Sequence, residues 1–140
     1  MLYLLDTNAI VALMKENINV MEQVRRVGRD QLRICAPVEA ELWFGVYKSG
    51  RPEENRHHLL TLLAWLPSLP FSSEATQHFG DIRAALAGQG KPIGPYDLQI
   101  AAIARAHGLI VVTHNTREFA RVPGLMLEDW QIELSIGEKN

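Results

Sequence analysis

The stretch Leu109-Ile110-Val111-Val112-Thr113 carries the strongest strand signal in the chain, because it is a continuous run of apolar and β-branched residues. A helical pattern over residues 96–107 precedes it, and the glycine at position 108 is a typical helix end. The polar residues His114 and Asn115 follow it. This stretch therefore predicts a buried strand that begins after a helix and ends in a polar loop.

The same alternation of strands and helices extends outward from this stretch over the rest of the chain. The sequence predicts short strands at 3–5, 32–35, 69–71, 109–113 and 125–127, and helices at about 7–15, 18–28, 37–48, 53–66, 72–90 and 96–107. Such alternation favours a mainly parallel sheet that is covered by helices on both faces. We therefore expect an α/β fold, a three-layer α/β/α sandwich, in a single domain over residues 1–140.

The composition narrows the class of protein. The chain has 140 residues, of which 47% are hydrophobic and 21% charged, with a formal net charge of −2. This composition excludes bulk disorder, and the single Cys35 excludes an internal disulfide and a multi-cysteine zinc site. No apolar run reaches the roughly 18 residues of a membrane span, and the first residues lack the features of a signal peptide. We expect a cytoplasmic protein without a membrane segment.

The distribution of charge matters more than its sum, so the net charge does not exclude nucleic acid as a partner. The segment from Glu128 onward carries four acids and one base, which leaves the preceding residues slightly basic. Four arginines crowd one stretch of the sequence: Arg25, Arg26, Arg29 and Arg33. They form either a solvated helix face or a contact surface for a phosphate backbone.

Three carboxylates occupy positions where an active site of this fold class is expected. Asp6 closes the first strand, and active sites of parallel sheets lie at the carboxyl ends of the strands. Asp97, in the first turn of its helix, and Glu41, inside another, each interrupt an apolar stripe. Each also has an ordinary explanation, namely a helix N-cap for Asp6, a complement to the helix dipole for Asp97 and a surface acid for Glu41.

Two residues after the strongest strand extend this set. Asn115 either offers a neutral oxygen to a cation or caps a short helix at 116–119, and Glu118 is a further candidate acid. Acids held close together repel one another, and a divalent cation removes that penalty. Because the donors are all oxygens, the set favours Mg²⁺, with Mn²⁺ as an alternative, over zinc. Such a site can activate water for attack on a phosphodiester.

The sequence resembles the PIN-domain ribonucleases, in particular the VapC-type toxins of type II toxin–antitoxin (VapBC) systems. The resemblance spans almost the whole chain in family order. It rests on Leu4-Leu5-Asp6-Thr7-Asn8, Ala40-Glu41-Leu42-Trp43-Phe44-Gly45, Ile93-Gly94-Pro95-Tyr96-Asp97, Ile100-Ala101-Ala102, Val112-Thr113-His114-Asn115, Phe119 and Val122-Pro123-Gly124-Leu125.

The resemblance implies a PIN-like fold and an endoribonuclease that inhibits translation and growth. It places Asp6, Glu41 and Asp97 as Mg²⁺ ligands, and Asn115 where many relatives carry a further Asp. It also implies supporting or substrate-contacting roles for a second set of residues: Thr7, Asn8, Tyr96, Thr113 and Glu118. The substrate implied is RNA, specifically tRNA cut in the anticodon stem-loop, with mRNA or rRNA as alternatives.

The resemblance also implies partners: a VapB-type antitoxin, a second copy of the chain in a homodimer, and DNA only indirectly through the antitoxin complex. The segment His58–Leu66 is apolar nearly all the way round, and Trp43, Phe44 and Tyr47 could flank it. Such a segment is either a thick part of the core or a protein interface.

Two other classes of protein remain open on the residues alone. An Asp that closes the first strand also suits a phosphoacceptor signalling domain or an aspartyl phosphatase. However, Asn8 stands where the phosphatase needs a second Asp, and the acidic pair and late lysine of the signalling domain are not evident. The chain could also be a catalytically weak RNA-binding module, with Asn115 as the mark of lost activity.

Overall fold

The computed structural model describes residues 1–133 and contains one five-stranded sheet in the order β3-β2-β1-β4-β5. All four strand pairings are parallel, which confirms the predicted sheet. The strands are β1 (Tyr3–Leu5), β2 (Leu32–Cys35), β3 (Ser68–Leu69), β4 (Ile110–Val112) and β5 (Met126–Glu128). The central position of β1 brings the residue that follows it, Asp6, to the middle of one sheet edge.

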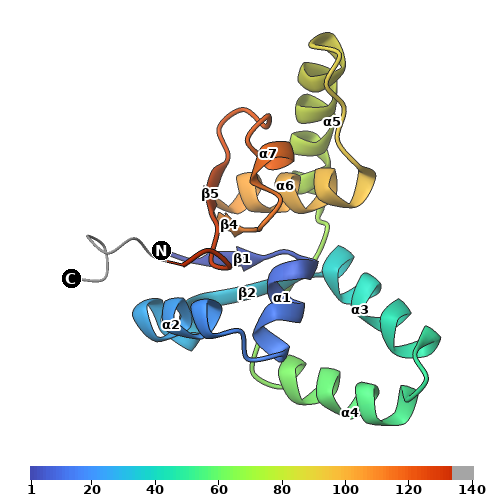
Figure 1. Cartoon of the computed structure of the whole chain (residues 1–140). Coiled ribbons are helices and arrows are strands. Elements are labelled where there is room, and N and C mark those ends of the chain that lie inside the picture. Colours follow the sequence, from blue (N-terminus) through green and yellow to red (C-terminus); the bar gives the residue numbers. More distant parts are fainter. Residues whose placement is uncertain (134–140) are drawn as a thin grey trace.

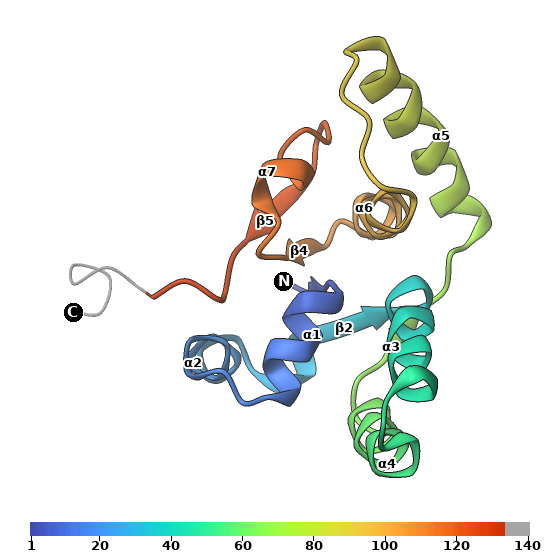
Figure 2. The same cartoon turned by 45° about the vertical axis from the view of Figure 1, so that its right-hand side comes forward.

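Helices cover both faces of this sheet (Figures 1 and 2). They are α1 (Thr7–Met14), α2 (Ile18–Val27), α3 (Ala36–Lys48), α4 (Pro52–Leu63), α5 (Ser73–Gly88), α6 (Pro95–His107) and α7 (Thr116–Phe119). Helices α1 and α2 lie on one face, and α6 with α5 lies on the other (Figure 2). Helix α3 starts directly after β2 and packs against both α1 and α6. The expected three-layer arrangement is therefore confirmed.

Local sequence explains where these elements begin and end. Proline occupies the first turn of α3, α4 and α6, where its missing N–H costs nothing. Gly108 ends α6 with a left-handed φ of +66°, which most other residues avoid. The apolar stripe of α6, with Ile100, Ala101 and Ala104, is fully buried against the sheet. Small alanines let this helix approach the strands closely, which fixes Asp97 in its first turn near the sheet edge.

Most predicted boundaries differ from the observed ones by one to three residues. The strand expected at 109–113 spans Ile110–Val112, and the strand expected at 69–71 spans Ser68–Leu69. The helix expected to reach residue 66 ends at Leu63. Proline disfavours helical geometry at the residue before it, so the chain turns ahead of Pro67 although its apolar pattern continues.

The apolar segment His58–Leu66 is mostly covered within the chain. Leu59, Leu62 and Leu66 are buried, and Trp65 is partly buried with the guanidinium of Arg29 3.8 Å from its ring centre. Leu60 remains 46% exposed. The core interpretation therefore accounts for most of this segment, and the homodimer stays a prediction.

Three of the four crowded arginines make contacts within the chain. Arg26 pairs with Glu128 at 2.9 Å, Arg29 stacks on Trp65, and Arg33 donates to backbone carbonyls. The expectation of one shared helix face is wrong, because only Arg25 and Arg26 lie on α2, while Arg29 lies in the turn that follows it and Arg33 lies on β2. The contacts within the chain also disfavour a dedicated phosphate surface. Of the acidic C-terminal segment, Glu138 and Lys139 lie outside the described residues. Within residues 1–133, no helix is both long enough and apolar enough to cross a membrane.

Candidate active site at the carboxyl edge of the sheet

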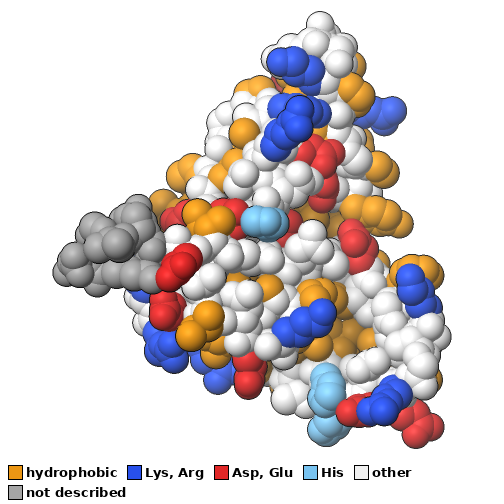
Figure 3. All heavy atoms as spheres, viewed as in Figure 1, with side chains coloured by type: hydrophobic (Ala, Val, Ile, Leu, Met, Phe, Trp, Pro, Cys, Tyr) orange, Lys and Arg blue, Asp and Glu red, His pale blue; other side chains and the backbone are white. Residues whose placement is uncertain are grey.

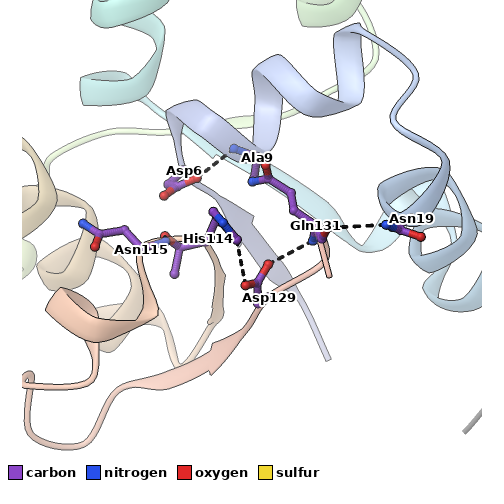
Figure 4. A network of polar contacts seen from close by, with 8 residues as sticks. Asp6, Ala9, Asn19, His114, Asn115, Asp129 and Gln131 are labelled. Carbon is purple, nitrogen blue, oxygen red and sulfur yellow. Dashed lines mark hydrogen bonds and ion pairs between the residues drawn. The ribbon is translucent and has the colours of Figure 1, made fainter. Parts of the chain in front are cut away.

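Asp6 lies at the carboxyl end of the central strand and is only 4% exposed. One carboxylate oxygen accepts a hydrogen bond from the backbone N–H of Ala9 at 2.9 Å, so Asp6 is the N-cap of α1 (Figure 4). Burial raises the pKa of Asp6, although hydrogen bonds from Thr113 and Ala9 oppose that rise. The N-cap interpretation and the site interpretation are thus compatible, because the capped carboxylate still faces other acids.

Asp97 is half-buried in the first turn of α6, and the pKa of its carboxyl group is strongly shifted. Burial is the main cause that raises the pKa of Asp97 to about 7, and the negative charge of Glu118 is the next. The charges of Asp6 and Glu41 contribute as well. The charges of three acids from other parts of the chain therefore act on Asp97. Asp6, Glu41, Asp97 and Glu118 are called here the acid cluster.

Glu118, from α7, is held in this cluster by two donors. The backbone N–H of Gly94 donates to it at 2.8 Å, and the side-chain amide of Asn115 donates to it at 2.6 Å. Burial alone would raise the pKa of Glu118, but these donors outweigh burial and lower the pKa. Glu118 is thus kept as a carboxylate beside Asp97, the acid whose pKa is raised.

Asn115 is the N-cap residue of α7, but its side chain links the acids instead of making a cap hydrogen bond. Its amide nitrogen donates to Glu118 and lies 3.5 Å from a carboxylate oxygen of Asp97, and its side chain makes no cap hydrogen bond. Its backbone N–H donates to the hydroxyl oxygen of Thr113 at 2.9 Å. In this arrangement the amide nitrogen faces the acids, whereas the two predicted roles of Asn115 were an amide oxygen offered to a cation and a cap of the short helix.

The remaining predicted residues surround this cluster. Glu41, on α3, is partly exposed, and its charge acts on both Asp6 and Asp97. Thr7 has a buried hydroxyl without a hydrogen-bond partner among the described residues. Asn8 is exposed on α1, and Tyr96 is 53% exposed beside Asp97.

A further acid at the same edge, Asp129, was not among the residues predicted from the sequence. It accepts from the backbone N–H of Gln131 and lies 2.9 Å from Nδ1 of His114, and its charge adds to the rise in the pKa of Asp6 (Figure 4). Its position carried a usable signal, since Asp129 directly follows β5 just as Asp6 directly follows β1.

The donor chemistry of the cluster fits a hard divalent cation. Across residues 1–133, no group of three or more His, Cys, Asp or Glu side chains is arranged to hold a metal ion as it stands. Mg²⁺, however, keeps several waters and is commonly held by only one or two carboxylates. Asp6 and Asp97 supply such a pair, and the unpartnered hydroxyl of Thr7 lies directly next to Asp6 in the chain.

Comparison with known proteins identifies one family and several similar proteins within it. The PIN domain family matches residues 3–125. The tRNA(fMet)-specific endonuclease VapC of Shigella flexneri is 39% identical over 128 residues, which cover 91% of this chain and 97% of that protein. Ribonuclease VapC2 of Haemophilus influenzae is also 39% identical, over 130 residues, again 91% of this chain and 97% of the relative.

Solved structures agree with these relatives. The DNA-bound VapBC of Salmonella typhimurium matches with a TM-score of 0.87 at 39% identity, over 93% of this chain and 99% of that one. VapBC2 of Rickettsia felis, bound to a DNA fragment from the promoter, matches with a TM-score of 0.83 at 36% identity and the same coverage. The chain belongs to the PIN-domain family and, within it, to the VapC ribonucleases.

Proposed function

We propose that this chain is the Mg²⁺-dependent endoribonuclease toxin of a type II toxin–antitoxin pair. The observation that carries the proposal is the convergence of Asp6, Asp97, Glu118 and Glu41, from four different elements, at the carboxyl edge of one parallel sheet. An unfilled cluster of acids is costly, so it indicates a cationic occupant. The names of the relatives identify the activity that such a site would serve.

In the proposed reaction, each residue of the site has one role. Asp6 and Asp97 hold Mg²⁺, for which Mn²⁺ can substitute, and Glu41 orients water from the open side. When bound, the ion polarises a phosphoryl oxygen and lowers the pKa of a water molecule. Asn115 keeps Asp97 and Glu118 in place through its amide, and Glu118 is itself anchored by Gly94.

The proposed substrate is tRNA, cut in the anticodon stem-loop in the cytoplasm. Two relatives are named as tRNA(fMet)-specific endonucleases. Tyr96 is 53% exposed beside Asp97, so its ring can stack on an unpaired base. Single-stranded loops offer such bases, whereas the deep major groove of an RNA helix does not. Cleavage of mRNA or rRNA is the competing outcome.

The proposed partner is a VapB-like antitoxin that occupies a groove between α1, α3 and α4. This groove, the α1–α3–α4 groove, has a volume of about 500 Å³. It is lined by Thr7, Val11, Met14, Lys15, Glu41, Leu42, Gly45, Val46, Asn55, His58 and Leu59. Hydrophobic side chains are visible between these three helices in Figure 3.

The lining of this groove suits a protein segment with an apolar face. A neighbouring hollow of about 630 Å³ shares Met14 and His58 with it and continues to Trp65. Glu41 belongs both to the groove and to the acid cluster, so a basic side chain of the antitoxin could reach the acids from there. Any contact with DNA would then come through the antitoxin, as in the DNA-bound VapBC relatives.

The deciding experiment incubates the purified chain with total tRNA, mRNA and rRNA in Mg²⁺ or in EDTA and maps the new ends by sequencing. We expect cleavage of tRNA only with Mg²⁺, loss of cleavage in Asp97→Asn, and normal cleavage in Glu39→Gln. Glu39 is a suitable control because it lies on α3 like Glu41 but accepts a hydrogen bond from Ser68.

Other outcomes would favour the other classes of protein. Cleavage that persists in EDTA would contradict the metal role. Binding of RNA without cleavage in any divalent cation would support an RNA-binding module. An acid-labile phosphate on Asp6 would support a phosphoacceptor domain.

A further inference from the structure

A second groove lies next to the α1–α3–α4 groove and shares Val11 and Lys15 of α1 with it. It has a volume of about 380 Å³ and is called here the His114 groove. It is lined by Asn8, Val11, Ala12, Lys15, Asn17, His114 and Gln131. None of these residues is Asp or Glu, although the groove adjoins the acid cluster. Figure 4 shows His114 with Asp6 and Asn115 on one side and Asp129 and Gln131 on the other.

The wall of this groove is built from segments far apart in the sequence. Asp129 lies 2.9 Å from Nδ1 of His114 through one carboxylate oxygen, and its other oxygen accepts from the backbone N–H of Gln131 at 2.9 Å. Asp129 is largely buried, with 12% of its side chain exposed, whereas 60% of the His114 side chain is exposed. Asp129 therefore holds the imidazole ring of His114 on its buried side, and the exposed part of the ring faces the groove.

Gln131 lines the groove, but its side-chain nitrogen is buried and has no hydrogen-bond partner among the described residues, so that nitrogen is not open to a ligand in the groove. Lys15 adds a positive charge at the same groove. Cationic and N–H donors without acids suit a ligand that is rich in oxygen acceptors and negatively charged.

We propose that the His114 groove is a nucleotide subsite for single-stranded RNA, in which Lys15 and His114 contact a backbone phosphate next to the bond that is cut. The inference rests on the proposed endoribonuclease activity. A strand with its scissile phosphate at the acid cluster can follow α1 through either of these two grooves, and Lys15 lines both of them. The α1–α3–α4 groove presents Glu41 and an apolar wall, which disfavour phosphate. The His114 groove presents donors without acids.

The test measures KM and kcat for cleavage of the mapped RNA by Lys15→Gln, Lys15→Glu and His114→Ala. We expect KM to rise about fivefold for Lys15→Gln and His114→Ala and further for Lys15→Glu, with kcat within about twofold of the parent chain. Lys48→Gln is the matched control, because Lys48 is an exposed lysine that lies over Phe44 outside this groove. Circular dichroism verifies that each variant is folded.

A second readout separates a phosphate contact from a structural role. The slope of log(1/KM) against log[salt] should become less steep by about 0.7 for Lys15→Gln, as expected for one lost contact on a single strand. An unchanged KM and an unchanged slope for both Lys15→Gln and His114→Ala would overturn the subsite. Weaker antitoxin binding by His114→Ala with normal KM would assign the groove to the antitoxin instead and would equally overturn it.

A third measurement keeps the subsite testable if the proposed function fails. Fluorescence anisotropy of a labelled single-stranded RNA in EDTA reports binding without cleavage. If the parent chain never cleaves RNA, weaker binding by Lys15→Gln and His114→Ala still supports the subsite, and equal binding by all variants rejects it.

Discussion

The two grooves beside α1 share part of one helix but differ in their apolar and acidic lining. Both are lined by Val11 and Lys15. Each groove also contains a histidine and at least one amide, but the α1–α3–α4 groove adds several large apolar side chains and one acid, Glu41, whereas the lining of the His114 groove adds only Ala12 as an apolar side chain and no acid. Both adjoin the acid cluster that begins at Asp6. The difference indicates that a single cluster can be approached from two sides, by a protein with a basic side chain and by RNA through its phosphates.

The largest expected effect comes from removing the cluster that the two grooves share. Asp97→Asn should lower cleavage by more than about 100-fold, because even partners that only orient metal ligands contribute 10- to 100-fold. Neither groove is lined by Asp97, so binding of the antitoxin and of single-stranded RNA in EDTA should persist. Isothermal calorimetry and anisotropy check these two affinities. If both were lost with cleavage, the grooves would not be separable from the cluster.

The next-largest effect should come from a substitution that obstructs the α1–α3–α4 groove and leaves the His114 groove unchanged. Gly45 lines this groove, and a Cβ atom built on it would meet no atom within 4 Å. Gly45→Gln should therefore place a side chain across the groove and weaken antitoxin binding by about tenfold, while improved helix propensity adds up to about 1 kcal/mol of stability. Gly45→Ala is the matched control, with the gain in stability but little obstruction. Weakened RNA cleavage in Gly45→Gln would contradict the separation of the two grooves.

The pH dependence of stability and of Mg²⁺ affinity tests the electrostatics of the acid cluster. The pKa of Asp97 is raised from 3.8 to about 7, so the folded, metal-free chain binds a proton between these values that the unfolded chain does not. Its stability should therefore decrease as pH rises from about 4 to 7. Mg²⁺ competes with that proton, so its apparent affinity should fall about fivefold between pH 7 and pH 6.

Thermal unfolding in EDTA and in Mg²⁺ at several pH values measures both trends. Asp97→Asn should flatten the curve in EDTA, since its amide does not titrate. A parent chain whose metal-free stability rises between pH 4 and 7 would show that other groups outweigh Asp97.

Local patterns predicted most of the fold, and the exceptions have physical reasons. Strands β1 and β4 are largely buried and appear as continuous apolar runs, and β2 differs only by the partly buried Arg33. Strand β3 has only two residues and begins at the exposed Ser68, so its sequence gives little signal. The α4 boundary was misplaced because the apolar pattern continues to Leu66, while Pro67 stops the helix earlier.

The site residues could be predicted from the sequence where the signal lay within a single helix or strand. Asp6 follows a strand and Asp97 interrupts an apolar stripe, and both features are local. The contact between His114 and Asp129 depends on β5 lying beside β4, which neither segment encodes by itself. The donor role of the Asn115 amide depends likewise on Glu118 and Asp97 meeting across two helices.

The smallest expected effect distinguishes the wall of the His114 groove from its proposed ligand contacts. Asn17 lines the groove, but its side-chain oxygen already accepts from the backbone N–H groups of Asn19 and Val20, at 3.0 and 3.1 Å, as the N-cap of α2. Asn17→Ala should therefore cost about 1 kcal/mol of stability, the usual value of a cap. Asn17→Ser should retain most of that stability, since serine also caps helices. KM for RNA should stay within about twofold in both variants, because the oxygen is committed to the helix. A raised KM in Asn17→Ala at unchanged stability would instead make Asn17 an RNA contact and extend the subsite toward α2.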